Sequence, residues 1–134
     1  MKVYVTTRFK GSNENKQEIE HLCFAVHDAG MQDFSFIRDV ENYQKVFDDP
    51  KDLWSRSLEE IEKCEALLID VSDHPSGGRV IEVGIAYALH KPVFVVVKNG
   101  MEYKDVYNGV AALVIRYDSY QDITDALKEY LLGR

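Results

Sequence analysis

Two apolar segments restrict the fold of this chain more than any other feature of its sequence. ALLIDV at 66–71 and PVFVVV at 92–97 each have the length of one strand, and their side chains are almost all apolar. Strands that are apolar on both faces are typical of a parallel sheet that helices cover on either side. The sequence therefore predicts an α/β fold built on a buried parallel sheet.

Strand and helix patterns alternate along the chain, which predicts right-handed crossovers between parallel strands. We expect a single domain over 1–134, with a five-stranded parallel sheet in a Rossmann-like or flavodoxin-like three-layer sandwich. Residues 40–50 are polar and irregular, and a loop with a helical turn is expected there. The other expected elements are strands at 2–7, 33–38, 66–71, 92–97 and 112–117, and helices from the Gly11–Asn13 loop to about 29, at 52–64, around Glu82 and at 120–132.

The composition narrows the classes of function that this chain can have. With 46% hydrophobic and 29% charged residues, it has the composition of a globular protein, and no apolar run reaches membrane-spanning length. The formal net charge of -7 argues against a nucleic-acid polymer as the main partner, since phosphate backbones require a basic surface. The N-terminal residues form a strand pattern without an export signal, so a cytoplasmic location is expected. Cys23 and Cys64 lack metal-ligand spacing and are expected to be buried free thiols.

Glu82 is the one carboxylate in a segment, residues 76–97, that is otherwise almost wholly apolar. A helix that is apolar on all sides is buried, and burial of a carboxylate is costly unless a partner or a reaction uses its charge. We expect Glu82 in about the first turn of its helix, where the helix dipole favours an ionised carboxylate that can act as a nucleophile. The alternative is a structural glutamate that pairs with Arg79.

Three loops are expected to meet at the carboxyl edge of the sheet, where ligands bind in folds of this class. They are residues 6–12, 70–79 and 98–103. The 70–79 loop combines hydroxyls, carboxylates and two glycines, so its backbone amides can approach an anion closely, although an ordinary turn has the same composition. In the first loop, Arg8 and Lys10 precede a helix and suit a phosphate or a carboxylate, although they also fit a solvated basic loop.

Single polar and aromatic residues near these loops have both a functional and a structural interpretation. His74 can serve as a general acid or base, but a lone loop histidine is more often solvated. Phe9 and Trp54 can stack on a nucleobase, although a tryptophan on a helix usually belongs to a core or an interface. Tyr4 is expected in the core, where its hydroxyl needs a partner such as Glu82.

Two stretches of the sequence carry the resemblance to a known family. VYVTTRFKG near the N-terminus and LLIDVSDHPSGGRVIEVGIAYALHKPV in the middle resemble the nucleoside 2-deoxyribosyltransferase family, and the order of strands and helices agrees over nearly the whole chain. The family pattern is a strand that ends in Asp, a loop with Pro, Ser or Gly, a helix with Glu-hydrophobic-Gly-x-Ala-x-Ala, and Lys-Pro before a hydrophobic strand. The matching residues are Asp70, Pro75, Ser76, Glu82, Gly84, Ala86, Ala88, Lys91 and Pro92.

The resemblance implies a reaction at the N-glycosidic bond of a nucleoside. The glutamate that matches Glu82 attacks the anomeric carbon, expels the base and forms a glycosyl-enzyme ester, which water or a second base resolves. The residue that matches Tyr4 orients this nucleophile, and Asp70 is expected to organise the site. The substrate is a nucleoside or a nucleotide, and no metal or organic cofactor is implied. Substrate-binding residues are expected to be Thr6, Arg8, Phe9, Lys10, Ser76, Gly77 and Gly78.

Two positions depart from the family pattern and leave several functions open. Ser57 stands where many members carry an aspartate that binds the sugar hydroxyls. Ser76 stands where base-exchanging transferases often carry an aspartate and where the branch that hydrolyses nucleoside 5'-monophosphates carries a serine. We expect cleavage of the N-glycosidic bond by hydrolysis or base exchange, and the alternative is a non-catalytic nucleotide-binding or signalling module. The resemblance also implies a homodimer or larger homo-oligomer, to which residues 100–108 are expected to contribute.

Overall fold

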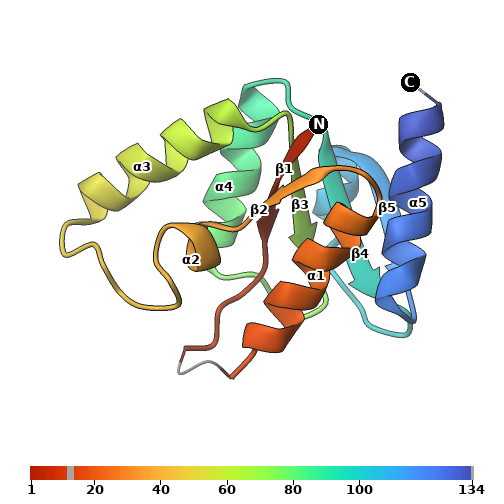
Figure 1. Cartoon of the computed structure of the whole chain (residues 1–134), viewed down its shortest axis with the longest axis horizontal. Helices are drawn as coiled ribbons and strands as arrows, with labels where there is room; N and C mark the ends of the chain where they lie inside the picture. Colours follow the sequence, from red (N-terminus) through yellow and green to blue (C-terminus); the bar gives the residue numbers. More distant parts are fainter. Residues whose placement is uncertain (12–13, 134) are drawn as a thin grey trace.

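Five parallel strands form the sheet that the sequence predicts, in the order β2-β1-β3-β4-β5 (Figure 1). The structure is a computed structural model that describes residues 1–11 and 14–133. The expected loop residues Ser12 and Asn13 lie outside the described residues. The elements are β1 (Lys2–Thr6), α1 (Lys16–Asp28), β2 (Gln32–Phe34), α2 (Phe36–Asp39), α3 (Pro50–Lys63), β3 (Ala66–Asp70), α4 (Gly77–Ala88), β4 (Val93–Lys98), the 3₁₀-helix η1 (Asp105–Gly109), β5 (Ala111–Tyr117) and α5 (Tyr120–Leu132).

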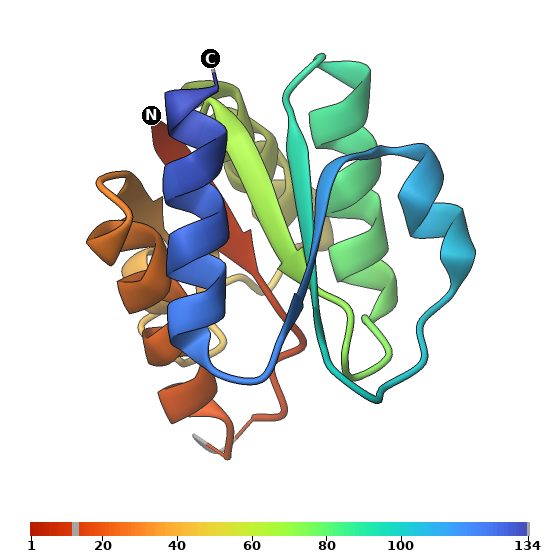
Figure 2. The same ribbon diagram turned by 90° about the vertical axis from the view of Figure 1, so that its right-hand side faces the viewer.

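Helices cover both faces of the sheet. On one face α1 packs against α5, and on the other α3 packs against α4. Figure 2 shows the sheet between α5 on one side and α4 on the other. The parallel topology and the three layers confirm the predicted flavodoxin-like fold. In the part of the chain that the structure describes, none of the helices combines the length and the apolar character that crossing a membrane requires.

The point where the strand order reverses lies between β1 and β3. The chain runs from β1 outward to β2 and then crosses back to β3 on the other side of β1. Ligands of such sheets bind in the crevice beyond the carboxyl ends of the two strands that flank this point. In Figures 1 and 2 the loops after β1, β3 and β4 gather at the same lower edge of the sheet. The loops that the sequence predicts for a site therefore share one edge.

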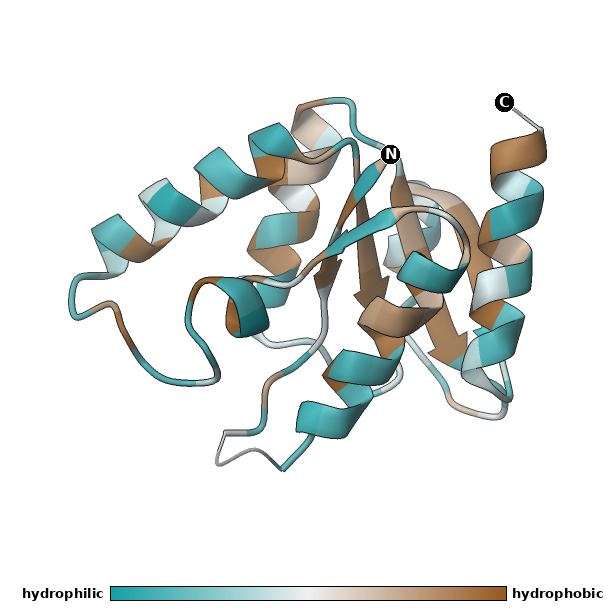
Figure 3. Ribbon diagram, viewed as in Figure 1, coloured by the Kyte–Doolittle hydropathy of each residue, from teal (hydrophilic) through white to brown (hydrophobic). Residues whose placement is uncertain are grey.

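The core has two parts, one on each face of the sheet. Because side chains alternate along a strand, Val3 and Val5 of β1 pack on the α1 and α5 side, whereas Tyr4 packs on the α3 and α4 side. Figure 3 shows the apolar strands in the interior and hydrophilic outer faces on the helices. Tyr4 is fully buried, so its hydroxyl has to find a partner inside the protein. Cys23 and Cys64 are buried free thiols, as predicted.

The predicted strand at 33–38 is wrong from residue 35 onward. β2 stops after three residues, and the short helix α2 follows it. Ser35 begins this helix, because its hydroxyl accepts a hydrogen bond from the N–H of Arg38 over 3.3 Å, and the Asp39 side chain accepts one from the N–H of Ser35 over 3.0 Å. An alternating apolar pattern this short fits a strand or a buried helical turn, and these capping bonds favour the helix.

α3 begins at Pro50, slightly earlier than the sequence predicts. The side chain of Asp49 accepts a hydrogen bond from the N–H of Lys51 over 2.9 Å, which caps the helix. Proline suits the first position of a helix because its missing N–H has no partner there in any case. The described residues between α2 and α3 form turns and bends, as their irregular sequence predicts.

Candidate active site

Three side chains converge on the buried carboxylate of Glu82. The hydroxyl of Tyr4 donates a hydrogen bond to Oε2, and the hydroxyl of Thr6 donates one to Oε1 over 2.8 Å. Nε of Arg79 lies 2.9 Å from Oε1 in an ion pair, but the direction of its N–H does not meet the alignment of a hydrogen bond. Only 1% of Glu82 is exposed. The two partners that the sequence suggests for Glu82, Arg79 and Tyr4, are both in place.

The periods of strand and helix explain why these groups meet. Tyr4 and Thr6 are two residues apart on β1, so both side chains point to the α3 and α4 side of the sheet. Arg79 and Glu82 are three residues apart on α4, so they are neighbours on one face of this helix. Because α4 begins at Gly77, Glu82 lies in its second turn, and the predicted first-turn position is wrong. The helix dipole acts mainly within the first turn, so the direct partners dominate.

Ser57 extends this network to α3. Its Oγ lies 3.1 Å from the Tyr4 hydroxyl, and both groups are buried. Since the Tyr4 hydroxyl donates its proton to Glu82, it accepts a hydrogen bond from Ser57. Ser57 is therefore a neutral donor, which adds no second negative charge beside Glu82.

Burial and neighbouring groups shift the pKa of Glu82 in opposite directions. Loss of solvent raises the pKa of Glu82 above its usual value, whereas first the charge of Arg79 and then the hydrogen bonds from Tyr4 and Thr6 lower it, and the net direction is upward. Burial, and next the charge of Glu82, raise the pKa of Tyr4. The Tyr4 hydroxyl therefore stays protonated and keeps donating to the carboxylate.

Glu41 is a second carboxylate near this cluster. Burial raises the pKa of Glu41, the charge of Arg79 lowers it, and the charge of Glu82 raises it. These effects place Glu41 within electrostatic reach of both residues. No sequence pattern predicts this proximity, because Glu41 belongs to the irregular segment between α2 and α3.

Asn15 holds the loop after β1, although its sequence context does not single it out. Its Oδ1 accepts a hydrogen bond from the N–H of Lys10 over 3.0 Å, and its side-chain amide donates to the carbonyl of Arg8.

Nζ of Lys10 lies 2.9 Å from Oδ2 of Asp73, so an exposed ion pair joins the loops after β1 and β3. The two predicted basic residues thus border the edge of the sheet. An open hollow of about 450 Å³ here is lined by Arg8, Phe9, Lys10, Glu14 and Asp73.

The two aromatic candidates lie on different sides of the sheet. Phe9 packs against the core on the α1 and α5 side, with its ring centroid 6.1 Å from that of Tyr43. Trp54 of α3 instead lies beside the first turn of α4, where a Cβ added to Gly78 would meet its ring at 3.8 Å. Because Glu82 faces the α3 and α4 side, Trp54 shares its layer and Phe9 does not.

The residues Ser76, Gly77 and Gly78 form the start of α4. Ser76 is the N-cap residue, and its side chain makes no capping hydrogen bond. The N–H groups of the first helical turn have no acceptor within their own helix. The exposed Ser76 hydroxyl and these amides are therefore able to bind an anion at the edge of the sheet.

Asp70 belongs to a different hydrogen-bond network from Glu82. Its carboxylate accepts hydrogen bonds from the Tyr117 hydroxyl over 2.5 Å and from the N–H of Ser72 over 2.8 Å. Oγ of Ser72 in turn accepts from the N–H of Lys98 over 2.7 Å, so this network ties together the carboxyl ends of β3, β4 and β5. Asp70 therefore orders the loop that leads to α4. Across residues 1–11 and 14–133, no group of three or more His, Cys, Asp or Glu side chains is arranged to hold a metal ion.

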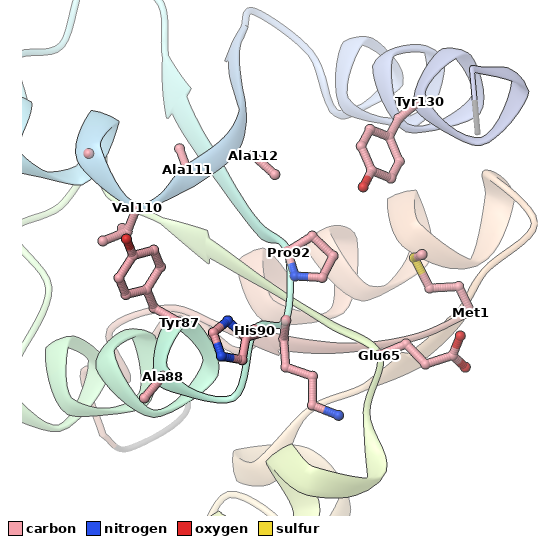
Figure 4. A pocket seen from close by; sticks show the side chains of 12 residues that line it. Met1, Glu65, Tyr87, Ala88, His90, Pro92, Val110, Ala111, Ala112 and Tyr130 are labelled. Carbon is pink, nitrogen blue, oxygen red and sulfur yellow. The ribbon is translucent and has the colours of Figure 1, made fainter.

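Two further hollows lie away from the Glu82 carboxylate. One of about 720 Å³ is at the opposite edge of the sheet, since Pro92 and Ala111 at the amino ends of β4 and β5 line it together with His90 and Tyr130 (Figure 4). The second, of about 260 Å³, lies between the β3–α4 loop and η1, and the exposed His74 borders it. Its lining residues are Val71, His74, Pro75, Val80, Tyr103, Lys104, Val106 and Tyr107.

Several solved structures share this fold. The CMP N-glycosidase BcmB of Clostridium botulinum has a TM-score of 0.68 and 17% identity, covering 97% of this chain and 100% of its own. The 2-deoxyribosyltransferase of Bacillus psychrosaccharolyticus has a TM-score of 0.67 and 17% identity, covering 93% and 91%. A conserved protein of Enterococcus faecalis has a TM-score of 0.75 and 14% identity, covering 97% and 98%. At these identities the likeness shows the fold.

A comparison of family patterns identifies the family. None of the curated proteins compared with this chain matches it. Residues 3–126, however, match the family described as nucleoside 2-deoxyribosyltransferase. This span runs from β1 into α5 and includes the whole cluster around Glu82. The chain therefore belongs to the nucleoside 2-deoxyribosyltransferase family, as its motifs predict.

Proposed function

We propose that this protein cleaves the N-glycosidic bond of a nucleoside or nucleoside 5'-monophosphate, with Glu82 as the nucleophile. The observation that carries the proposal is the fully buried carboxylate of Glu82, which Tyr4, Thr6 and Arg79 hold near the carboxyl end of β1. Ionisable groups with strongly perturbed surroundings concentrate at functional sites. Membership of the family supports the same assignment.

In the proposed reaction an oxygen of Glu82 attacks the anomeric carbon while the bond from this carbon to the base breaks. The electrons of that bond pass to the base nitrogen, which is protonated from solvent, and Glu82 becomes a glycosyl ester. Water, or a nitrogen of a second base, then attacks the anomeric carbon and releases the carboxylate, and the attacking group loses its proton to solvent. The hydrogen bond from Tyr4 keeps the carboxylate oriented in both steps.

The sugar-phosphate end of the substrate is assigned to the start of α4. A phosphate there accepts hydrogen bonds from the Ser76 hydroxyl and from the Gly77 and Gly78 amides, and Arg8 adds a positive charge from the first loop. Lys10 shares this edge, although Asp73 already neutralises it. The proposed role of Asp70 is to fix the loop that presents these groups.

The base is assigned to the side of Trp54. This ring lies beside Gly78 in the same layer as Glu82, and every base offers a flat face on which an indole can stack. Ser76 favours a 5'-monophosphate over an unphosphorylated nucleoside, because it donates to a phosphate where an aspartate would repel it. The likeness in fold to a CMP N-glycosidase supports the same substrate class.

We also propose that the protein forms a homo-oligomer. Three apolar side chains on the outer face of α4 are about half exposed, namely Val80 (48%), Ile81 (51%) and Tyr87 (54%). Val106 in η1 is 70% exposed, within the stretch 100–108 that is expected to contribute to subunit contacts. A second copy of the chain that covers these side chains would remove a large apolar area from water.

A non-catalytic nucleotide-binding module is the second candidate function. Two features favour it. Ser57 stands where the resemblance implies a sugar-binding aspartate, and the Glu82 carboxylate is closed off by its partners. The two functions differ in whether a bound substrate loses its base.

A panel of deoxynucleosides, ribonucleosides and their 5'-monophosphates tests the proposal. Each compound is incubated with purified protein, with and without an added acceptor base, and free base and new nucleosides are separated by chromatography. Release of base from a monophosphate, absent in the Glu82→Ala variant, is the expected result. Binding of a nucleotide without any release, measured by calorimetry on the same samples, favours the non-catalytic module. New nucleosides with an acceptor base identify a transferase.

A further inference from the structure

Arg79 is the positively charged partner of the buried Glu82 carboxylate. The hydroxyls of Tyr4, Thr6 and Ser57, which also act on this carboxylate, are neutral. The Arg79 side chain is only 17% exposed, so solvent screens the ion pair with Glu82 weakly. In the described part of the chain, no other arginine or lysine forms an ion pair with Glu82. Without Arg79 the carboxylate would be buried among hydroxyls alone.

We propose that Arg79 is a positioning residue whose guanidinium supplies the counter-charge that keeps Glu82 in the ionised form able to attack the substrate. This role deepens and rests on the proposed function of Glu82. A protonated carboxylic acid is a poor nucleophile, whereas a carboxylate with a fixed counter-ion keeps both its charge and its direction. The 2.9 Å distance from Arg79 Nε to Oε1 leaves the contact electrostatic, since the N–H is not aligned as a hydrogen bond.

None of the other described charged or titratable groups around Glu82 can replace the positive charge of Arg79. β1 contributes Tyr4, which is neutral, and α3 contributes the neutral hydroxyl of Ser57. The segment between α2 and α3 contributes Glu41, whose negative charge opposes that of Glu82. Without Arg79, Glu82 would have no ion-pair partner among the described residues, and burial would then drive the pKa of Glu82 further upward.

Substitutions at Arg79 separate its charge from its volume. Arg79→Gln keeps a polar side chain without charge, and Arg79→Lys restores a positive charge at the same position. Arg56→Gln is a matched control, because Arg56 also pairs with a buried glutamate, Glu60, at 3.3 Å. This pair lies outside the Glu82 cluster, and Lys63 at 3.5 Å remains as a second partner of Glu60.

The first measurement is the pH dependence of kcat/KM for base release from the best substrate of the panel. In Arg79→Gln the acidic limb should move to higher pH, and activity at acidic pH should fall about tenfold for every pH unit that the limb moves, with recovery at alkaline pH. Arg79→Lys should restore most of the wild-type profile, and Arg56→Gln should retain it. An acidic limb that stays in place in Arg79→Gln, with a proportional loss at every pH, overturns the proposal.

The second measurement needs no turnover. The ionisation of Glu82 is followed by carbon-13 NMR of carboxyl-labelled protein, with its signal assigned by its absence from Glu82→Gln. Glu82 should titrate at higher pH in Arg79→Gln than in the wild type, and an unchanged midpoint in a folded variant overturns the role of Arg79. A wild type that releases no base rejects the proposed function instead, so the two failures are distinguishable.

Discussion

The hydroxyl of Tyr4 donates a hydrogen bond to the carboxylate of Glu82, although the two residues lie 78 positions apart in the chain. This bond joins the centre of β1 to the second turn of α4, and Ser57 extends it to α3. One hydroxyl therefore links a strand of the sheet to the two helices that cover this face. The proposed nucleophile is oriented by the packed core rather than by a mobile loop.

Tyr4→Phe should lower kcat without unfolding the protein. The substitution removes one hydrogen bond to Glu82 and leaves Ser57 without its partner, which costs about 1–3 kcal/mol, or roughly tenfold to a hundredfold in rate if expressed at the transition state. Tyr43→Phe is the control, since Tyr43 donates to Glu20 outside the cluster. Steady-state kinetics at saturating substrate check the prediction, and equal kcat values for the two variants would contradict it.

The buried carboxylate should also make the stability of the protein depend on pH. Because the pKa of Glu82 is raised in the folded state above its ordinary value of 4.5, its contribution to stability is greatest below that value and is lost as pH rises through the folded pKa. The unfolding free energy of the wild type minus that of Glu82→Gln should therefore fall with rising pH. Urea unfolding of both proteins from about pH 4 to pH 8 measures this difference. A difference that stays constant or grows with pH would rule out the raised pKa.

Ser76→Asp should separate phosphorylated from unphosphorylated substrates. A carboxylate at the start of α4 repels a 5'-phosphate bound there, so KM should rise about tenfold or more for a nucleoside 5'-monophosphate and much less for the nucleoside. Ser119→Asp provides the control, because Ser119 is the N-cap residue of α5. An equal change in KM for both substrates would place the phosphate elsewhere.

Ile81→Asp should weaken the proposed homo-oligomer. The side chain is half exposed on the outer face of α4, so the substitution leaves the core of the subunit intact but puts a charge into the proposed contact. Phe24→Asp on α1 is the matched control, since Phe24 is 64% exposed on the opposite face of the sheet. Sedimentation should show smaller particles for Ile81→Asp and unchanged particles for Phe24→Asp. A wild type that sediments as a monomer contradicts the oligomer outright.

The fold could be predicted from the sequence because its strongest signals are long apolar runs and the alternation of strands with helices. Uniformly apolar runs marked β3 and β4 as buried parallel strands, and the alternation of elements indicated the remaining topology. The expected strand at 33–38 failed over residues 35–38 for a local reason. Side-chain capping by Ser35 and Asp39 decided between two structures that the apolar pattern fits equally well.

The contact between Tyr4 and Glu82 could be predicted from the sequence, whereas the positions of Phe9 and Glu41 could not. A tyrosine in the core needs a partner for its hydroxyl, and the resemblance implies the same neighbour, so the contact of Tyr4 with Glu82 could be anticipated. The separation of Phe9 from this layer depends on how the loop after β1 turns, and Asn15 fixes that turn by contacts that no period encodes. The charges of Arg79 and Glu82 affect the pKa of Glu41, which lies in an irregular segment where sequence spacing carries no information about direction.

The most direct test of Glu82 as the nucleophile is its covalent state during turnover. Excess substrate is mixed with protein, the reaction is quenched in acid within its first turnovers, and peptides are analysed by mass spectrometry. The peptide containing Glu82 should carry the sugar of the substrate as an ester, and the same peptide of Glu82→Gln should carry none. Base release with this peptide unmodified, or with the sugar on another residue, would contradict Glu82 as the nucleophile.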